Sequence, residues 1–273
     1  MKKRILKIVA FCLAVALTIG VCSFANGLVG NPISKMMARR TAEKHLETNY
    51  ADTDYAIKKL SYSFKDGGYY AYISSPSSMD GHFTLRISMS GKLTNDDYSS
   101  RVENHGNVAN RLYFEYREMV DSVLTSYAFP YEISMGYGSL EFDREIGTED
   151  LSENAVKRNE LVNDRFYNIN ELGITNGKLV LYIDDDTVTH EKAAEILLKT
   201  KELMDMAGIS FYSVYFCLRY PPYDPAESYK RPEGEIAIRT FLYTDIYEED
   251  MTERVTKAVE DTQNYYKEQD KLK

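Results

Sequence analysis

The chain has 273 residues, of which 44% are hydrophobic and 27% charged, a composition typical of a globular protein with a sizeable core. The formal net charge of -9 argues against nucleic-acid binding, because phosphate contacts need clusters of lysine and arginine. Cys217 is the only one of three cysteines outside the apolar N-terminal stretch, and the four histidines are scattered. We therefore expect no internal disulfide in the body and no zinc site.

The first element is an apolar helix. Residues 8–25 carry no charge and follow a cluster of cations, Lys2, Lys3, Arg4 and Lys7. A helix over residues 5–29 is long enough to cross a hydrocarbon core of ~30 Å. The cations before it favour a cytoplasmic N-terminus. We predict that residues 1–30 form a single-pass signal-anchor in the cell membrane, with the body on the extracytoplasmic side.

Two other roles for this stretch stay open. A secretory signal shares the basic start, and Ser23-Phe24-Ala25 offers an exit site for its cleavage. Lipid attachment at Cys22 is less favoured, because the bulky Val21 precedes the cysteine where a small residue is expected. A helix buried in a soluble core is disfavoured, since the stretch has no polar face.

Residues 31–130 are predicted to form an α-β-β-β-α module. Asn31-Pro32 marks the start of a helix that runs to about Tyr50. Three segments then alternate apolar and polar residues with the period of a strand, and Asp66-Gly67-Gly68 forms a turn between the first two. A long amphipathic helix, residues 99–127, ends near Pro130 and is expected to cover the apolar face of this sheet.

Residues 131–273 are predicted to form a second module. We expect a hairpin in residues 131–142 that turns at Gly136–Gly138, then helix and loop. A buried strand follows, then a helix capped by Thr189. Two antiparallel strands and a last helix complete the module; they cover residues 209–220, 235–243 and 248–273. The predicted fold class is α+β: an N-terminal transmembrane helix, then two small modules of antiparallel sheet covered by helices.

No motif predicts catalysis, a metal or a cofactor. Asp184–Asp186 lack the alternate spacing of a calcium loop and fit the start of a helix. The stretch SSPSSMDGHF combines serines with Asp80 and His82, yet no strained G-x-S-x-G turn accompanies them, and a turn-rich connection between strands explains the stretch. The sequence contains no phosphate loop, dinucleotide fingerprint or H-E-x-x-H.

The strongest candidate for recognition is the segment RYPPYDPAESYKRPEG, residues 219–234. It holds four of the seven prolines, and proline lowers the entropy that a loop loses on binding. Tyrosine and arginine are favoured in interaction hot spots. We therefore interpret the segment as a candidate partner-binding loop that uses Arg219, Tyr220, Tyr223, Tyr229 and Arg231. The alternative is a hairpin connection that folds back on the body.

Several long stretches resemble one family. They are GNPISKMMARRTAEKHLETNY, SYSFKDGGYYAYISSPSSMDGHF, GITNGKLVLYI and LRYPPYDPAESYKRPEG. Together they are similar to the YfjL-like proteins, small membrane-anchored proteins of Gram-positive bacteria with no assigned activity. The resemblance implies a retained anchor and a two-module α+β body, and it brings no catalytic or binding residues.

The leading functional hypothesis is a binding or sensing module at the cell envelope. Its expected partners are the lipid bilayer, through the N-terminal helix, and an envelope protein or polymer. It predicts exposed tyrosines and prolines on residues 219–234. The alternative is a cell-envelope hydrolase acting on wall glycan or peptide, which predicts a cleft where two acids, or an acid and a histidine, meet with perturbed pKa values. A structural accessory of a membrane complex is a third hypothesis.

Overall fold

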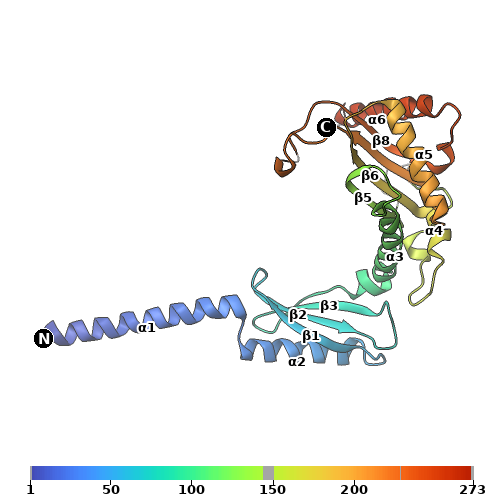
Figure 1. Ribbon diagram of the computed structural model, residues 1–273. Coiled ribbons are helices and arrows are strands. Elements are labelled where there is room, and N and C mark those ends of the chain that lie inside the picture. Colours follow the sequence, from blue (N-terminus) through green and yellow to red (C-terminus); the bar gives the residue numbers. More distant parts are fainter. Residues whose placement is uncertain (1, 144–150, 228, 272–273) are drawn as a thin grey trace. The chain divides into compact units, whose positions relative to one another are not determined.

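A computed structural model describes residues 2–143, 151–227 and 229–271 of the chain (Figure 1). The chain divides into two compact units, Met1–Asn107 and Val108–Lys273. Within the described residues, each unit contains one four-stranded sheet, ordered β1-β2-β3-β4 and β5-β6-β7-β8. The predicted α+β class with two sheet modules is therefore confirmed.

The apolar N-terminal stretch forms one helix, α1 (Lys2–Val29). The helix itself matches the prediction. Its predicted role as a membrane span is not confirmed, because no helix in the described part of the chain combines the length and apolarity that crossing a membrane requires.

Helix α2 (Pro32–Asn49) begins where the sequence predicts. The Asn31 Oδ1 atom accepts a hydrogen bond of 2.7 Å from the Ser34 backbone N–H, and Pro32 occupies the first turn, where no intrahelical N–H is needed. The side chains of Ala38 and Ala42 are fully buried, and these small residues let the helix lie close to the first sheet.

The first sheet is antiparallel throughout and contains β1 (Ala56–Ser63), β2 (Gly68–Ser74), β3 (His82–Ser88) and β4 (Leu93–Asp96). Alternation along β2 and β3 places one set of side chains on a single buried face. Helix α2 lies along this sheet (Figure 1). This set comprises Tyr69, Ala71, Ile73, Phe83, Leu85 and Ile87. The opposite face of the sheet carries the alternate, more polar residues.

The helix predicted over residues 99–127 is two elements. A short π-helical turn, Ser99–Glu103, ends before α3 (Gly106–Leu124) begins. A side chain at Gly106 would collide with the Ser100 carbonyl oxygen. The break divides the segment that the sequence pattern predicts as one helix.

Helix α3 belongs to the second core and does not cover the first sheet. Its buried residues Leu112, Tyr116 and Val120 pack with the second unit, and α2 provides the cover predicted for the first sheet. The units consequently divide between Asn107 and Val108, whereas the sequence pattern places the boundary near Pro130.

Residues 131–142 form one strand, β5 (Glu132–Leu140), so the predicted hairpin is wrong. Gly136 and Gly138 do not form a turn; they lie where α3 packs closely on the strand. A Cβ atom at Gly138 would lie 2.5 Å from the Val120 Cγ2 atom, and one at Gly136 would lie 3.2 Å from the Leu124 Cδ1 atom. Both contacts are made by α3, so the glycines allow that helix to approach the strand.

The rest of the second unit follows the predicted order, with one change of direction. Strand β6 (Gly177–Asp184) is parallel to β7 (Ser213–Arg219), because α5 (His190–Met206) connects them as a crossover. The prediction of an all-antiparallel sheet is wrong for this pair. The other pairs, β5–β6 and β7 with β8 (Glu235–Leu242), are antiparallel.

Two further helices complete the unit. Helix α4 (Ile169–Asn176) lies in the segment predicted as helix and loop, together with a 3-10 turn over Arg158–Glu160. Helix α6 (Met251–Lys271) contacts β8 and α5. Residues 144–150 of the predicted helix-and-loop segment lie outside the described residues.

Candidate functional site

The predicted partner-binding loop connects β7 to β8, and its two arginines bind the same carboxylate. Arg219 Nε and Arg231 Nη1 each donate a hydrogen bond of 3.0 Å to Asp184 Oδ1. Ser134 Oγ donates to the same oxygen at 3.1 Å. The Asp184 side chain is only 7% exposed, so its charge is satisfied almost entirely by these groups.

The aromatic residues of the loop differ in exposure. Tyr223 and Tyr229 are each 76% exposed, as the binding hypothesis predicts. Tyr220 is half-buried, and its carbonyl oxygen accepts a hydrogen bond of 2.9 Å from Arg231 Nη1. The five predicted residues therefore separate into three at the base of the loop, Arg219, Tyr220 and Arg231, and two tyrosines at the surface.

Sequence reasoning missed the role of Asp184 as the anchor of this loop. Strands β6 and β7 run in parallel, and Asp184 is the register partner of Arg219, so the two residues end their strands side by side. The sequence does contain a signal for this contact, because a helix between two strands is typical of a parallel pair. Parallel pairing of β6 and β7 places Asp184 beside Arg219. The neighbouring Asp185 accepts a hydrogen bond from the Thr187 N–H at 2.8 Å, which fits the turn that leads to α5.

The serine, aspartate and histidine of the β2–β3 connection differ in their exposure. Asp80 is buried, whereas the His82 side chain is exposed. The Asn107 side chain donates hydrogen bonds of 2.7 and 2.6 Å to the carbonyl oxygens of Asp80 and His82, which fixes the connection against the start of α3. The described residues contain no group of three or more His, Cys, Asp or Glu side chains suited to a metal.

A histidine and an acid do meet in the first unit, in a structural contact. The His45 Nε2 atom lies 2.8 Å from Asp96 Oδ2, and the Tyr50 hydroxyl donates to the same oxygen at 2.9 Å. Asn49 Nδ2 lies 3.0 Å from His45 Nδ1. Both ring nitrogens thus have protein partners, and the contact ties the end of α2 to β4. Burial raises the pKa of Tyr50, with a further contribution from Asp96.

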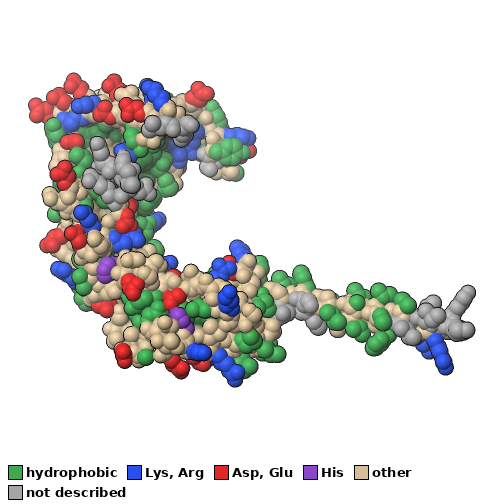
Figure 2. Space-filling view, turned by 180° about the vertical axis from the view of Figure 1, so that it is seen from behind, with side chains coloured by type: hydrophobic (Ala, Val, Ile, Leu, Met, Phe, Trp, Pro, Cys, Tyr) green, Lys and Arg blue, Asp and Glu red, His purple; other side chains and the backbone are tan. Residues whose placement is uncertain are grey.

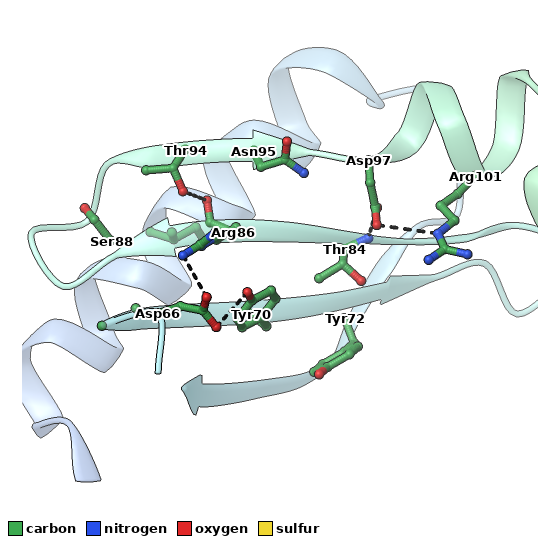
Figure 3. Close-up of a pocket in the computed structure, with 13 residues that line it drawn as sticks. Asp66, Tyr70, Tyr72, Thr84, Arg86, Ser88, Thr94, Asn95, Asp97 and Arg101 are labelled. Atoms are coloured by element: carbon green, nitrogen blue, oxygen red, sulfur yellow. Dashed lines mark hydrogen bonds and ion pairs between the residues drawn. The ribbon is translucent and has the colours of Figure 1, made fainter. Parts of the chain in front are cut away.

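The open face of the first sheet forms a shallow depression of about 750 Å³ (Figure 3). Alternation along the strands brings Tyr70 and Tyr72 from β2, and Thr84 and Arg86 from β3, to this face. We call it the open face; its lining residues are Asp66, Gly67, Gly68, Tyr70, Tyr72, Thr84, Arg86, Ile87, Ser88, Thr94, Asn95, Asp97 and Arg101.

One end of the open face is organised by Asp66. Its carboxylate accepts hydrogen bonds from the hydroxyls of Ser63 at 2.6 Å and Tyr70 at 2.9 Å, and from Arg86 Nη2 at 3.0 Å. Figure 3 shows Asp66, Tyr70 and Arg86 pointing toward one another. The Ser63 and Tyr70 hydrogen bonds hold the pKa of Asp66 below its usual range. The Tyr70 side chain is therefore held in place by Asp66.

The rest of the open face is more accessible. Tyr72 is 43% exposed, with the Lys59 ammonium 5.8 Å from its ring centre. At the far end the Arg101 guanidinium lies 3.7 Å from the Asp97 carboxylate. Sequence reasoning recognised the alternation of these strands but did not identify their polar side as a candidate site, because Asp66 and Arg86 meet only through the strand register.

Comparisons with known proteins agree with the division into two units. A family described as "YfjL-like, N-terminal domain" matches residues 5–97, and one described as "YfjL-like C-terminal domain" matches residues 115–256. The chain matches no curated protein and no solved structure. Because the two matches cover most of the chain and follow one another in the expected order, the chain belongs to the YfjL-like family.

Proposed function

We propose that this chain is a binding or sensing module of the cell envelope, attached to the lipid bilayer through α1 and facing the extracytoplasmic side. The observation that carries the proposal is the open face of the first sheet. Its opposite face is covered by α2, whereas the open face presents Tyr70, Tyr72 and Arg86 to solvent. A shallow surface with pre-positioned aromatic and charged side chains suits recognition of an extended partner.

The attachment through α1 rests on the exposure of its apolar side chains. Phe11 is 71% exposed, Leu17 68% and Val21 67%. Figure 2 shows hydrophobic side chains along this helix, with cations near its beginning. A helix that is apolar on all sides is unfavourable in water and is normally covered by protein or lipid. Insertion of these side chains into lipid would remove them from water, and Arg4 and Lys7 suit anionic headgroups.

The loop of residues 220–234 provides a second surface for a partner. Tyr223 and Tyr229 each leave 76% of their area exposed, and the ion pairs of Asp184 hold the base of the loop. A loop that is already ordered loses less entropy on binding. An envelope protein is the partner that suits two exposed tyrosines on a stiff loop, since such residues dominate protein contacts.

The shifted pKa values of Asp66 and Glu195 do not support the hydrolase alternative. Hydrogen bonds lower the pKa of Asp66, and the Lys192 side chain lowers that of Glu195. A glycoside hydrolase needs a carboxyl with a raised pKa as its proton donor. A lowered pKa keeps both groups ionised at neutral pH, which suits hydrogen bonding and ion pairing.

Binding can be tested by sedimentation with isolated cell-envelope fragments. The detergent-solubilised full-length chain is expected to sediment with the fragments, and the variant Tyr72→Ala is expected to sediment less. Tyr127→Ala is the matched control, because Tyr127 is fully exposed at a position outside the open face. Failure of the wild-type chain to sediment contradicts the proposed function. If Tyr72→Ala and Tyr127→Ala reduce sedimentation equally, the open face is not the binding surface.

Attachment and orientation need separate measurements. In vesicles, Cys12 of a chain with Cys22→Ser and Cys217→Ser is expected to resist a water-soluble maleimide, although its side chain is exposed in the structure. Addition of detergent and denaturant should restore labelling. Protease added to intact protoplasts is expected to digest both sheet units while a cytoplasmic marker survives. Rapid labelling in vesicles contradicts lipid insertion, and survival of the sheet units contradicts the outward orientation.

A further inference from the structure

We infer that the open face of the first sheet binds an uncharged glycan chain. The inference rests on the proposed function and names the ligand class of the same surface. It follows from three properties of the face: its charges are balanced, two of its tyrosines lie on one strand, and its shape is a shallow trough lined by hydrogen-bonding groups.

The charge balance disfavours an anionic polymer. Among the lining residues, Asp66 pairs with Arg86, and Asp97 lies 3.7 Å from Arg101. Each arginine therefore already faces a carboxylate. Lys59 adds one cation beside Tyr72. Binding of a polyanion relies on several uncompensated cations along its path, and the balanced pairs do not provide them.

The two tyrosines suit the shape of a sugar ring. Tyr70 and Tyr72 lie on the same side of β2, about 6.8 Å apart along the strand. A pyranose ring has an apolar face of C–H groups and an edge of hydroxyls. The apolar face can pack on a phenol ring, and the hydroxyls can bond to polar groups around it. Tyr72 is the more accessible platform, because 43% of its area is exposed.

The polar groups around the rings are already positioned. The Asp66 carboxylate accepts hydrogen bonds from the Tyr70 hydroxyl and the Arg86 guanidinium. The Thr94 hydroxyl donates a hydrogen bond of 2.9 Å to the Arg86 carbonyl oxygen. Carboxylate and guanidinium groups are planar and can bond to two neighbouring hydroxyls at once. Because a glycan hydroxyl both donates and accepts, it can add to such pairs without breaking the charge balance.

A polypeptide strand is a less suitable occupant. Extended peptides bind sheets mainly through the free edge of a strand, where backbone N–H and C=O groups are available. Tyr70, Tyr72 and Arg86 instead lie on β2 and β3, whose backbone groups are paired within the sheet on both sides, and the edge strand β4, which adds Thr94 and Asn95, is only four residues long. Recognition at the tyrosines therefore comes from side chains, as for a ligand that carries its own hydroxyls.

The test measures binding of the neutral N-acetylglucosamine oligomer chitohexaose to the detergent-solubilised full-length chain by calorimetry. Tyr72→Ala is expected to weaken binding about tenfold or more, the loss typical of removing one aromatic stacking platform. Tyr72→Phe keeps the ring and is expected to stay within about threefold of the wild type. Tyr127→Ala should bind like the wild type. Poly-γ-glutamate, an anionic polymer, should not bind.

The outcomes separate this inference from the proposed function. If chitohexaose does not bind, or binds Tyr72→Ala as tightly as the wild type, the glycan inference is overturned. If poly-γ-glutamate binds more tightly than chitohexaose, the charge argument is wrong. Sedimentation with envelope fragments that still depends on Tyr72 then leaves the binding function standing with another ligand. If the wild-type chain does not sediment with envelope fragments, the proposed binding function is itself contradicted.

Discussion

The Arg231 guanidinium, near the end of the long β7–β8 connection, lies 3.0 Å from the Asp184 carboxylate at the end of β6. This contact closes the loop onto the sheet, since Arg219 binds the same carboxylate oxygen from the end of β7. The loop of residues 220–234 is fixed at its base, and Tyr223 and Tyr229 remain exposed.

Replacement of this carboxylate should destabilise the second unit. Asp184→Ala leaves two arginines, 23% and 16% exposed, without their shared partner, and we expect a loss of about 2–4 kcal/mol in the free energy of unfolding. Urea denaturation measures this loss. Trypsin should also cleave after Lys230 faster than in the wild type, because the base of the loop is released.

The exposed neighbour Asp186 provides the control for this substitution. Asp186→Ala removes the same charge from a surface position and should change stability by less than about 0.5 kcal/mol. Equal effects of the two substitutions would show that the Asp184 ion pairs do not hold the loop.

Substitution of Gly138 by alanine should disturb the contact between β5 and α3. The added Cβ would lie 2.5 Å from Val120 Cγ2 and 2.9 Å from Tyr116 Cε1, so the helix must move. We expect a loss of about 1–3 kcal/mol, the usual cost of overpacking a core. Thermal unfolding checks the prediction. Gly20→Ala is the control, since its Cβ meets no atom within 4 Å, and a stability loss equal to that of Gly138→Ala would contradict the packing argument.

The glycines illustrate where sequence reasoning succeeds and fails. Asp66-Gly67-Gly68 was expected to turn the chain, and it does, because Gly67 has a positive φ of 59° between two paired strands. Gly136 and Gly138 suggested a second turn, yet they lie inside β5. The same residue type supplies backbone freedom in one place and space for a helix in the other. Only the position of α3 distinguishes the two uses.

The partner of an amphipathic helix is equally hard to predict. Local periodicity shows that α3 has an apolar face, and Tyr116 and Val120 are indeed fully buried. Periodicity does not show which sheet this apolar face packs against, because each of the two sheets has an apolar face of its own. The helix follows the first sheet in the chain and packs in the second core. The start of α2 at Asn31-Pro32 was predictable, because capping depends on neighbours in sequence alone.

Acid should weaken the first unit partly through Asp66. Hydrogen bonds from Ser63 and Tyr70 hold its folded pKa below the ordinary value of 3.8. A carboxyl whose pKa is lower in the folded chain binds fewer protons there than in the unfolded chain. Its stabilising effect is therefore complete above the unfolded pKa and is lost as the pH falls through the folded pKa.

Unfolding of the wild type and of Asp66→Asn across acid pH tests this sign. The stability of the wild type should fall more steeply below about pH 4 than that of the variant, so that the two curves converge at low pH. Asp52→Asn changes the same charge at an exposed position and should keep the slope of the wild type. Parallel curves for the wild type and Asp66→Asn would show that the Asp66 hydrogen bonds do not contribute.

The thiol of Cys217 should report unfolding of the second unit. It lies in β7 with 2% of its area exposed, and burial raises its pKa to about 12, with a smaller contribution from Glu235. The thiolate is the reactive form, and at pH 8 only about one thiol in ten thousand is ionised at that pKa. In a chain with Cys12→Ser and Cys22→Ser, iodoacetamide should label Cys217 only when the unit opens. Labelling should accelerate in urea, and the further substitution Asp184→Ala should increase the rate in native buffer about tenfold for each 1.4 kcal/mol of stability that is lost. A rate in native buffer equal to that of free cysteine would mean that β7 is not buried as the structure describes.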